Sequence, residues 1–238
     1  IITPLKDRFG AQIRTHYPLD TELELAVVRQ EARPLDAAAL EIPDLRVEVP
    51  EYMAEIVATV THEARRSPHV NQRSGVSVRL TIANYETMVA NATRRALRLG
   101  EPEAVPRISD LAALASSTAG KVEIEAFEEG RAEATLDRMV AGAVLSVFKE
   151  RVPAGRFGDA IAEFDTGTVV HTGDDIASGD YMKMLAGLPA LRGAVLPLVD
   201  SETPAAVASA TEWVLEGLHL SRRLNKDSAG AQATYRGR

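Results

Sequence analysis

Apolar residues recur at helical spacing along much of the chain, and residues that cap or stop helices separate the apolar stretches. Asp20 stands where an N-cap belongs, Pro34 and Pro68 follow two of the stretches as helix breakers, and Gly100 follows a third as a C-cap. This pattern indicates amphipathic helices that each bury one face. The predicted helices cover 21–33, 50–67, 77–100 and 127–151, together with a last helix that opens at Thr203-Pro204.

The remaining segments have weaker patterns. Residues 11–17 alternate apolar and polar side chains through Ile13 and Tyr17, which predicts a short strand. Residues 108–120 can form a helix with Ser109 as its cap, and 153–204 mix short apolar segments with many glycines, which favours short helices and loops. The last 14 residues, 225–238, lack apolar periodicity and are expected to form a mobile tail.

Composition agrees with a mainly α fold. Only 5% of the 238 residues are aromatic, and Ala, Leu, Glu and Arg, which favour helices, are abundant. The length exceeds the ~100 to 150 residues of a typical domain, so one large or two small domains are expected. A Pro-rich connector at 101–107 marks one candidate boundary.

Charge and cysteine content exclude several kinds of chemistry. The absence of cysteine excludes disulfides, a thiol nucleophile and thiolate metal sites, and is compatible with the cytoplasm, which is the expected location. A net charge of -7 makes nucleic-acid binding unexpected. No run approaches the ~18 apolar residues that span a bilayer, so membrane insertion is not expected.

Two groups of residues could act in chemistry. The run PLKDRFG at 4–10 precedes the predicted strand and the pair Tyr17-Pro18, and Glu22 or Glu24 follows in the next helix. The run GVSVR at 75–79 places Arg79 in the first turn of the helix at 77–100, with Arg73 nearby. Taken alone, Asp7 and Arg8 could form an ordinary surface ion pair, and Arg79 could be a solvated side chain.

Together the two groups resemble AAA+ ATPases of the magnesium-chelatase ATPase subunit and MoxR group. In that group a DRF triplet precedes a strand and a tyrosine-proline pair, and a G-x-S-x-R element heads a helix of the lid. The resemblance covers about residues 1–115. It implies that 1–19 end an α/β core that includes one short strand and that 20–115 form a helical lid. Residues 116–224 would form a further helical extension, similar to that of magnesium-chelatase-like bacterial proteins, before the tail at 225–238.

The resemblance also implies roles for three arginines. Arg8 would be the arginine finger, which acts in trans on the nucleotide of a neighbouring subunit, and Arg79 would be sensor 2, which contacts the phosphates bound by its own subunit. Arg73 is a weaker candidate for the second role. ATP and Mg²⁺ are the implied ligands, and self-association into a ring, expected to be a hexamer, is the implied assembly. The ring would remodel a partner or support metal insertion, and a partner or client could dock on the extension.

Important parts of an ATPase are missing from this sequence. It contains no G-x-x-x-x-G-K-[ST] loop and no apolar strand that ends in the paired acids that bind Mg²⁺. The chain therefore provides at most part of an ATPase. The alternative is a non-enzymatic helical module, in which 101–238 binds a partner protein.

Other candidates are weaker. His62-Glu63 begins like H-E-x-x-H, but Arg66 stands where the second histidine belongs, so no metal site is predicted. Ordinary structural roles are the better interpretation of the remaining groups, which are the acidic loop with Asp174, Asp175 and Asp180, the pair Ser116 and Ser117, the basic helix face with Arg94, Arg95 and Arg98, and the apolar stripe at 136–148.

Overall fold

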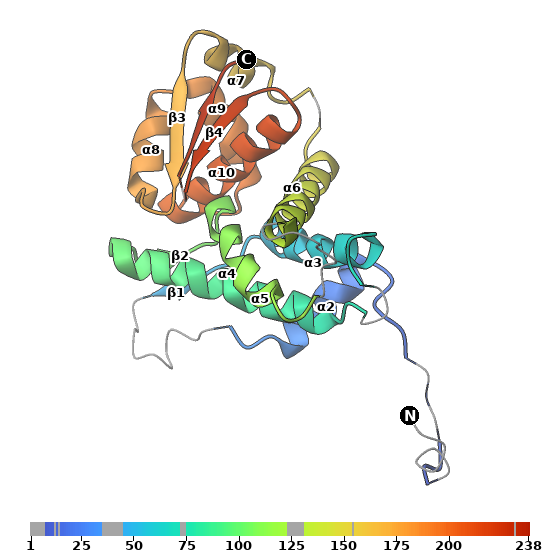
Figure 1. The fold of residues 1–238 in the computed structure, drawn as a ribbon. Helices are drawn as coiled ribbons and strands as arrows, with labels where there is room; N and C mark the ends of the chain where they lie inside the picture. Colours follow the sequence, from blue (N-terminus) through green and yellow to red (C-terminus); the bar gives the residue numbers. More distant parts are fainter. Residues whose placement is uncertain are drawn as a thin grey trace.

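The computed structural model describes residues 8–11, 13, 15–34, 45–71, 75–122, 131–153, 155–230 and 232–238, the side chains of residues 131 and 132 excepted. Within these residues the protein is mainly helical, as the sequence predicts (Figure 1).

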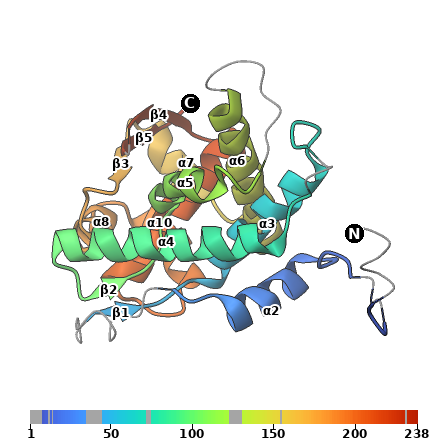
Figure 2. The same cartoon turned by 60° about the horizontal axis from the view of Figure 1, so that its bottom comes forward.

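Three helices from the first half of the chain pack against one another: α2 (Thr21–Glu31), α3 (Glu51–Arg66) and α4 (Val78–Leu99) (Figure 2). The predicted caps are present, because Asp20 Oδ1 accepts a hydrogen bond from the Leu23 N–H at 2.8 Å and Gly100 ends α4. Ser77 Oγ caps the other end of α4. A short parallel pair, β1 (Arg46–Val47) and β2 (Glu103–Ala104), joins the segment before α3 to the segment after α4.

The chain then crosses to a second group of helices. A 3₁₀ helix, η1 (Ile108–Ala113), continues into α5 (Leu114–Thr118), which packs on α4. The long helix α6 (Arg131–Arg151) packs along α3, and it also contacts α10 (Pro204–Leu220).

The last third of the chain combines short helices with a small sheet. The sheet is antiparallel, in the order β3-β5-β4, and Figure 1 shows it beside the helices α8, α9 and α10. These elements are α7 (Gly158–Asp165), β3 (Val169–Gly173), α8 (Ser178–Ala186), α9 (Pro189–Val195), η2 (Leu196–Leu198), β4 (Asn225–Ala229) and β5 (Gln232–Arg236).

Helix α10 lies in the centre of this region. Every residue from Ala205 to Leu218 is buried, and these residues include Ser209, Glu212 and Glu216. Its polar side chains have partners: Ser209 Oγ donates to the Pro106 carbonyl at 2.5 Å, and Glu216 accepts a hydrogen bond from the Tyr235 hydroxyl at 2.5 Å. α10 is therefore enclosed by elements from both halves of the chain.

Aromatic side chains connect α3, α6 and α10 in one core. The rings of Tyr52 and Trp213 stack with their centroids 4.1 Å apart, and Phe148 meets Trp213 edge to face at 5.6 Å. The Phe148 ring also lies against the backbone of Gly217, where a Cβ would come within 2.3 Å of it. Close packing of this kind leaves no room for an added methyl group.

Four local predictions differ from the structure. The described residues of the predicted strand at 11–17 form no strand, because within the described residues no neighbouring strand is present to pair with them. The helical spacing of Leu23, Val27 and Val28 predicts that they share one face of α2, but Leu23 is exposed, whereas Glu24 is buried. Ser109 is not the cap, because η1 begins at Ile108 with Arg107 as its N-cap, and the Ser109 N–H donates to Glu212. Residues 225–238, for which the sequence predicts a mobile tail, contain β4 and β5.

We predict that Gly217→Ala lowers the free energy of unfolding. Overpacking against Phe148 costs about 1–3 kcal/mol, which exceeds the roughly 0.5–1 kcal/mol that alanine contributes to a helix interior. Gly142→Ala in α6 is the matched control, because no atom lies within 4 Å of its added Cβ, and it should stabilise the protein. Urea unfolding measures both, and equal stabilisation by the two substitutions would contradict the packing argument.

Candidate functional site

The buried carboxylate of Glu24 joins three helices. Glu24 on α2 has no exposed surface, and Arg65 of α3 donates two hydrogen bonds to it, Nη1 to Oε2 at 2.6 Å and Nη2 to Oε1 at 2.9 Å. The hydroxyl of Thr81 on α4 donates to Oε1 at 2.5 Å and lies 2.8 Å from the hydroxyl of Thr61. A buried charge is tolerated only when it is paired and hydrogen-bonded. These four residues, the Glu24 cluster, therefore set the relative positions of α2, α3 and α4.

Arg65 also connects this cluster to two segments that the sequence singles out. Its Nε donates to the Val76 carbonyl at 2.9 Å, and its guanidinium carbon lies 4.8 Å from the centroid of the Tyr17 ring, a cation–π contact. Gly75 has φ +70, and a Cβ there would lie 2.3 Å from the Tyr17 hydroxyl oxygen. The Tyr17-Pro18 pair and the GVSVR run therefore lie side by side, although they are far apart in the sequence.

The three candidate arginines differ in their placement. Arg79 lies exposed in the first turn of α4, and its side chain makes no hydrogen bond or ion pair with the described residues. Arg8 is also exposed, in the N-terminal segment that Figures 1 and 2 show running out from α2, away from the other helices. The structure does not bring the two together. Arg73 lies outside the described residues.

Exposed apolar side chains concentrate around the first of the two motifs. Among the described residues, seven large apolar side chains are exposed, and five of these lie between residues 9 and 23. Clustered exposure of this kind is typical of a surface that packs against another domain or protein. The five are Phe9, Ile13, Tyr17, Leu19 and Leu23.

A second buried polar cluster joins α4 to the C-terminal region. Arg95 of α4 donates to Asp110 Oδ2 at 2.9 Å, and the Arg107 backbone N–H donates to the same oxygen at 2.8 Å. The Arg107 side chain continues to the Ile176 carbonyl at 2.8 Å and to Ser178 Oγ at 2.5 Å, at the start of α8. Arg95 is buried, so the basic face with Arg94, Arg95 and Arg98 is not uniformly solvated as the sequence suggests.

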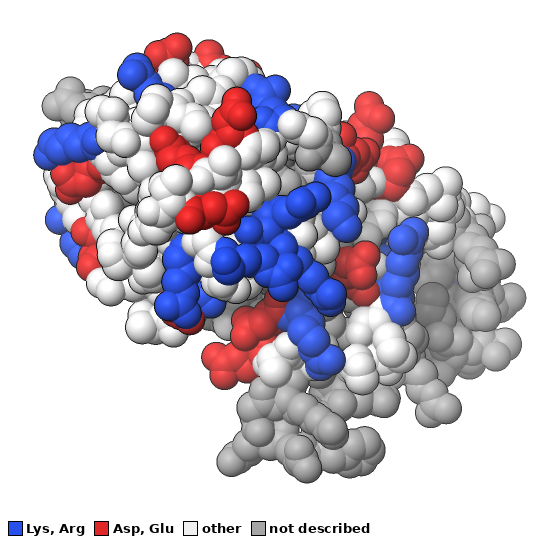
Figure 3. Space-filling model, turned by 90° about the horizontal axis from the view of Figure 1, so that it is seen from above, with Lys and Arg blue, Asp and Glu red and all other residues white. Residues whose placement is uncertain are grey.

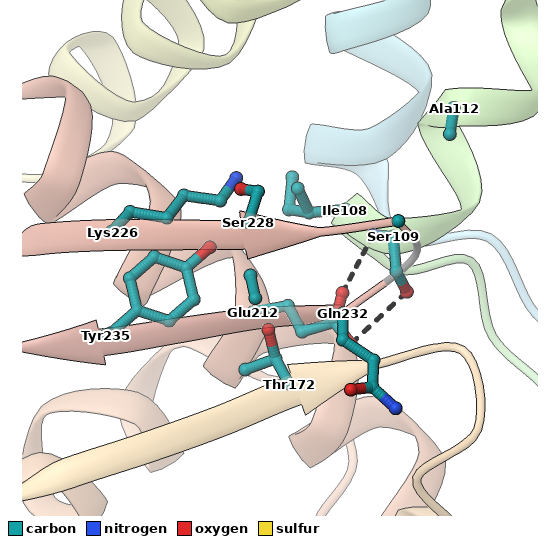
Figure 4. A pocket seen from close by; sticks show the side chains of 11 residues that line it. Ile108, Ser109, Ala112, Thr172, Glu212, Lys226, Ser228, Gln232 and Tyr235 are labelled. Carbon is teal, nitrogen blue, oxygen red and sulfur yellow. Dashed lines mark hydrogen bonds between the residues drawn. The ribbon is translucent and has the colours of Figure 1, made fainter.

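A small polar cavity of about 150 Å³ lies between η1 and the sheet (Figure 4). Glu212 lines it and accepts hydrogen bonds from the Ser109 N–H at 2.8 Å and the Tyr181 hydroxyl at 2.6 Å. Burial raises the pKa of Glu212, and the nearby Arg107 opposes this shift. The cavity is smaller than the ~300 Å³ at which small-molecule sites begin, so these contacts have a structural role.

The other candidates from the sequence also have structural surroundings. Arg98 pairs with Asp174 at 3.1 Å, and Ser117 Oγ donates to Asn84 Oδ1 at 2.6 Å. His62 lies 3.4 Å from Glu24, but the described residues contain no group of three or more metal-ligating side chains that could bind a metal ion. The apolar stripe at 136–148 contributes to the main core.

The sequence does not single out Arg65, and it leaves both Glu22 and Glu24 as candidates. A signal for Glu24 was present, because Glu24 precedes Val27 and Val28 by three and four residues and so shares their helix face. No comparable signal identifies Arg65, which is one of two consecutive arginines in α3. Its role depends on a tertiary contact.

Comparisons of the chain with protein-family models, with curated proteins and with solved structures gave no match in any of the three. Among the helices of the described residues, none combines the length and the apolar character needed to cross a membrane.

We predict that Glu24→Ala destabilises the protein by about 3–5 kcal/mol, because it leaves the largely desolvated guanidinium of Arg65, whose side chain is 12% exposed, without its partner. Glu22→Ala removes an exposed acid from the same turn of α2 and should change stability by less than about 0.5 kcal/mol. Urea unfolding of both variants checks this. Equal effects would show that the Glu24 cluster does not stabilise the helix arrangement.

The raised pKa of Glu212 predicts a pH dependence. In the unfolded chain this carboxyl ionises near pH 4.5, whereas in the folded protein it retains its proton to higher pH. Stability should therefore fall as the pH rises between these two pKa values, since ionisation favours the unfolded state. Glu212→Gln cannot ionise and should remove this part of the slope, measured by urea unfolding across the range. Glu63→Gln, at an exposed position, should leave the slope unchanged.

Proposed function

We propose that the chain contains the lid of an AAA+ ATPase of the magnesium-chelatase and MoxR type. The observation that supports this most directly is the contact between the two motifs: Tyr17 lies against Gly75, and Arg65 bridges both. In the proposed lid, this contact connects the end of the ATPase core to the helix that begins with Arg79. The resemblance depends on these two motifs. Because they lie in contact, a movement of one would displace the other.

Arg79 has the properties required of a phosphate-sensing residue. Its guanidinium is exposed and makes no ion pair with the described residues, so it is free to contact an anion. Arginine binds phosphate oxygens through paired N–H donors. When ATP is bound, Arg79 would contact its phosphates, and loss of the γ-phosphate would weaken this contact and favour another lid position.

The Glu24 cluster would let the lid move as one body. Its hydrogen bonds connect α2, α3 and α4, and Arg65 extends them to the Val76 carbonyl, three residues before Arg79. A displacement of Arg79 is therefore passed to α2 and to the segment before it. Rigid elements that rotate about a hinge are a common means of coupling nucleotide state to assembly.

Arg8 would act on a different nucleotide. It is exposed on a segment that extends from the helices, and the neighbouring exposed apolar side chains, such as Phe9 and Ile13, could pack against an α/β core. An arginine supplied in trans stabilises the charge of the transition state and in other enzymes contributes about 10³ to 10⁵ in rate. Such an arrangement requires a ring of head-to-tail subunits.

The residues that the structure describes do not suffice to bind Mg²⁺. The described residues contain no cluster of acids or histidines that could bind a metal ion, and the sequence lacks the phosphate-binding loop. The proposal therefore requires that the natural protein provide these groups in residues outside this sequence. A coding sequence upstream with a P-loop and an acidic strand would agree with it, whereas their absence would favour the non-enzymatic module.

We predict that Arg8→Ala in the natural full-length protein lowers ATP hydrolysis by about 10³- to 10⁵-fold without changing the fold. Arg8→Ala subunits mixed with subunits that lack the P-loop lysine should recover activity, because each type supplies what its neighbour lacks. Arg94→Ala is the control, since Arg94 is an exposed arginine bonded only to Asn91 among the described residues. Full activity of rings made of Arg8→Ala subunits alone would refute the assignment.

A further inference from the structure

A larger cavity lies where α6 and α10 end. Its volume is about 460 Å³, within the ~300 to 1,000 Å³ that is usual for small-molecule sites. It lies apart from both buried polar clusters, and none of their residues lines it. Its apolar lining consists of Phe148, Val152, Pro153, Phe157, Ile161 and Leu218.

The apolar lining is held in a defined position by the core. The Phe148 ring packs on Gly217, meets Trp213 edge to face, and lies 5.5 Å from the ring of Phe157. Val152 and Phe157 are almost fully buried. A site whose walls are fixed before binding loses little conformational entropy when it is occupied.

Basic side chains stand at the edge of this lining. Lys149, Arg151 and Arg223 line the cavity, together with the single acid Glu150. Arg151 is already paired with Glu55, Nε to Oε2 at 2.5 Å. Lys149 and Arg223, in contrast, are exposed and their side chains form no hydrogen bond or ion pair with the described residues. Two cations are therefore available to an anionic group.

The turn after α10 positions Arg223. Its backbone N–H donates to the Leu218 carbonyl at 2.8 Å, and the preceding Arg222 has φ 60, in the left-handed region. Arg238 donates from Nη1 to the Arg222 carbonyl at 3.0 Å, which adds a third arginine to this turn. Figure 3, seen from the side on which the C-terminus lies in Figure 1, shows Lys and Arg side chains gathered in the middle of the face.

This concentration of positive charge contrasts with the net charge of -7. Basic residues near helix ends also interact favourably with the helix dipole, which accounts in part for Lys149 in the last turn of α6. The dipole does not account for Arg223, which lies beyond the end of α10, nor for the apolar cavity between the two cations. The partial negative charge of a helix end is also smaller than the full charges of these side chains.

We propose that this cavity binds an organic anion with an apolar body. The apolar body, of the size of a small aromatic ring system, would pack on Phe148 and Ile161, and a carboxylate, sulfonate or phosphate group would lie between Lys149 and Arg223. Apolar contacts provide the affinity, while the two cations orient the ligand and select for charge. This inference does not depend on the proposed ATPase, because the cavity shares no residue with its motifs.

Anilinonaphthalene sulfonate is a suitable probe, since it combines an apolar ring system with one anionic group. Trp213 is the only tryptophan and contacts Phe148 in the cavity wall, so energy transfer from Trp213 reports binding close to this site. We expect saturable binding of one probe molecule with strong transfer. The uncharged analogue N-phenylnaphthylamine should bind at least about tenfold more weakly, because it loses the contact with both cations.

Substitutions locate the probe. The double variant Lys149→Glu and Arg223→Glu should weaken binding of the sulfonate by more than about tenfold and leave the uncharged analogue unaffected, and Ile161→Gln should weaken both. Arg94→Glu, a single charge reversal at an exposed position on α4, is the control and should change neither. Circular dichroism confirms that each variant is folded. Equal affinity for the two probes, or unchanged binding of the sulfonate by the double variant, would overturn the proposal.

Discussion

The buried carboxylate of Glu24 is the constraint on which the first half of the structure depends. A carboxylate with no exposed surface is stable only with a complete set of partners. For Glu24 of α2 these partners come from two other helices, Arg65 from α3 and Thr81 from α4. Because Arg65 also contacts Tyr17 and the Val76 carbonyl, the same charge pair places the segment before α2 beside the start of α4. The candidate site is thus a consequence of satisfying one buried charge.

The second half of the structure depends on the burial of α10. All of its faces are covered: α6, α8, α9 and η1 pack against it, and Tyr52 of α3 and Tyr235 of β5 contact its side chains. The stacked rings of Tyr52 and Trp213 unite the two halves in one core, while the Asp110 contacts join α4 to α8 through Arg107. The cavity lies at the ends of α6 and α10. Its apolar walls include Phe148, Phe157 and Leu218, which belong to the main core and are held in position by it.

The longer helices could be predicted from the sequence, because their apolar spacing and caps are local properties. Asp20, Ser77 and Thr203 cap helices by hydrogen bonds within a few residues. Prediction was poorer for the sheet. Tyr235 is the only residue of β4 and β5 that is buried, so residues 225–238 resemble a polar tail until β3 pairs with β5. The paired strand lies more than fifty residues earlier, at Val169–Gly173, and no local pattern indicates that pairing.

The amino-acid sequence by itself determined the positions of the long helices and the two motifs that suggest a nucleotide-dependent machine. The tertiary structure decided which of two neighbouring side chains is buried. On α2 it is Glu24 rather than Leu23, and on α4 it is Arg95 rather than Arg94. It also decided that Tyr17 and Gly75 meet and that Lys149 and Arg223 flank one cavity. The physical reason is that a helix forms through interactions between residues a few positions apart. A buried charge needs partners, and a cavity needs walls, that come from distant parts of the chain.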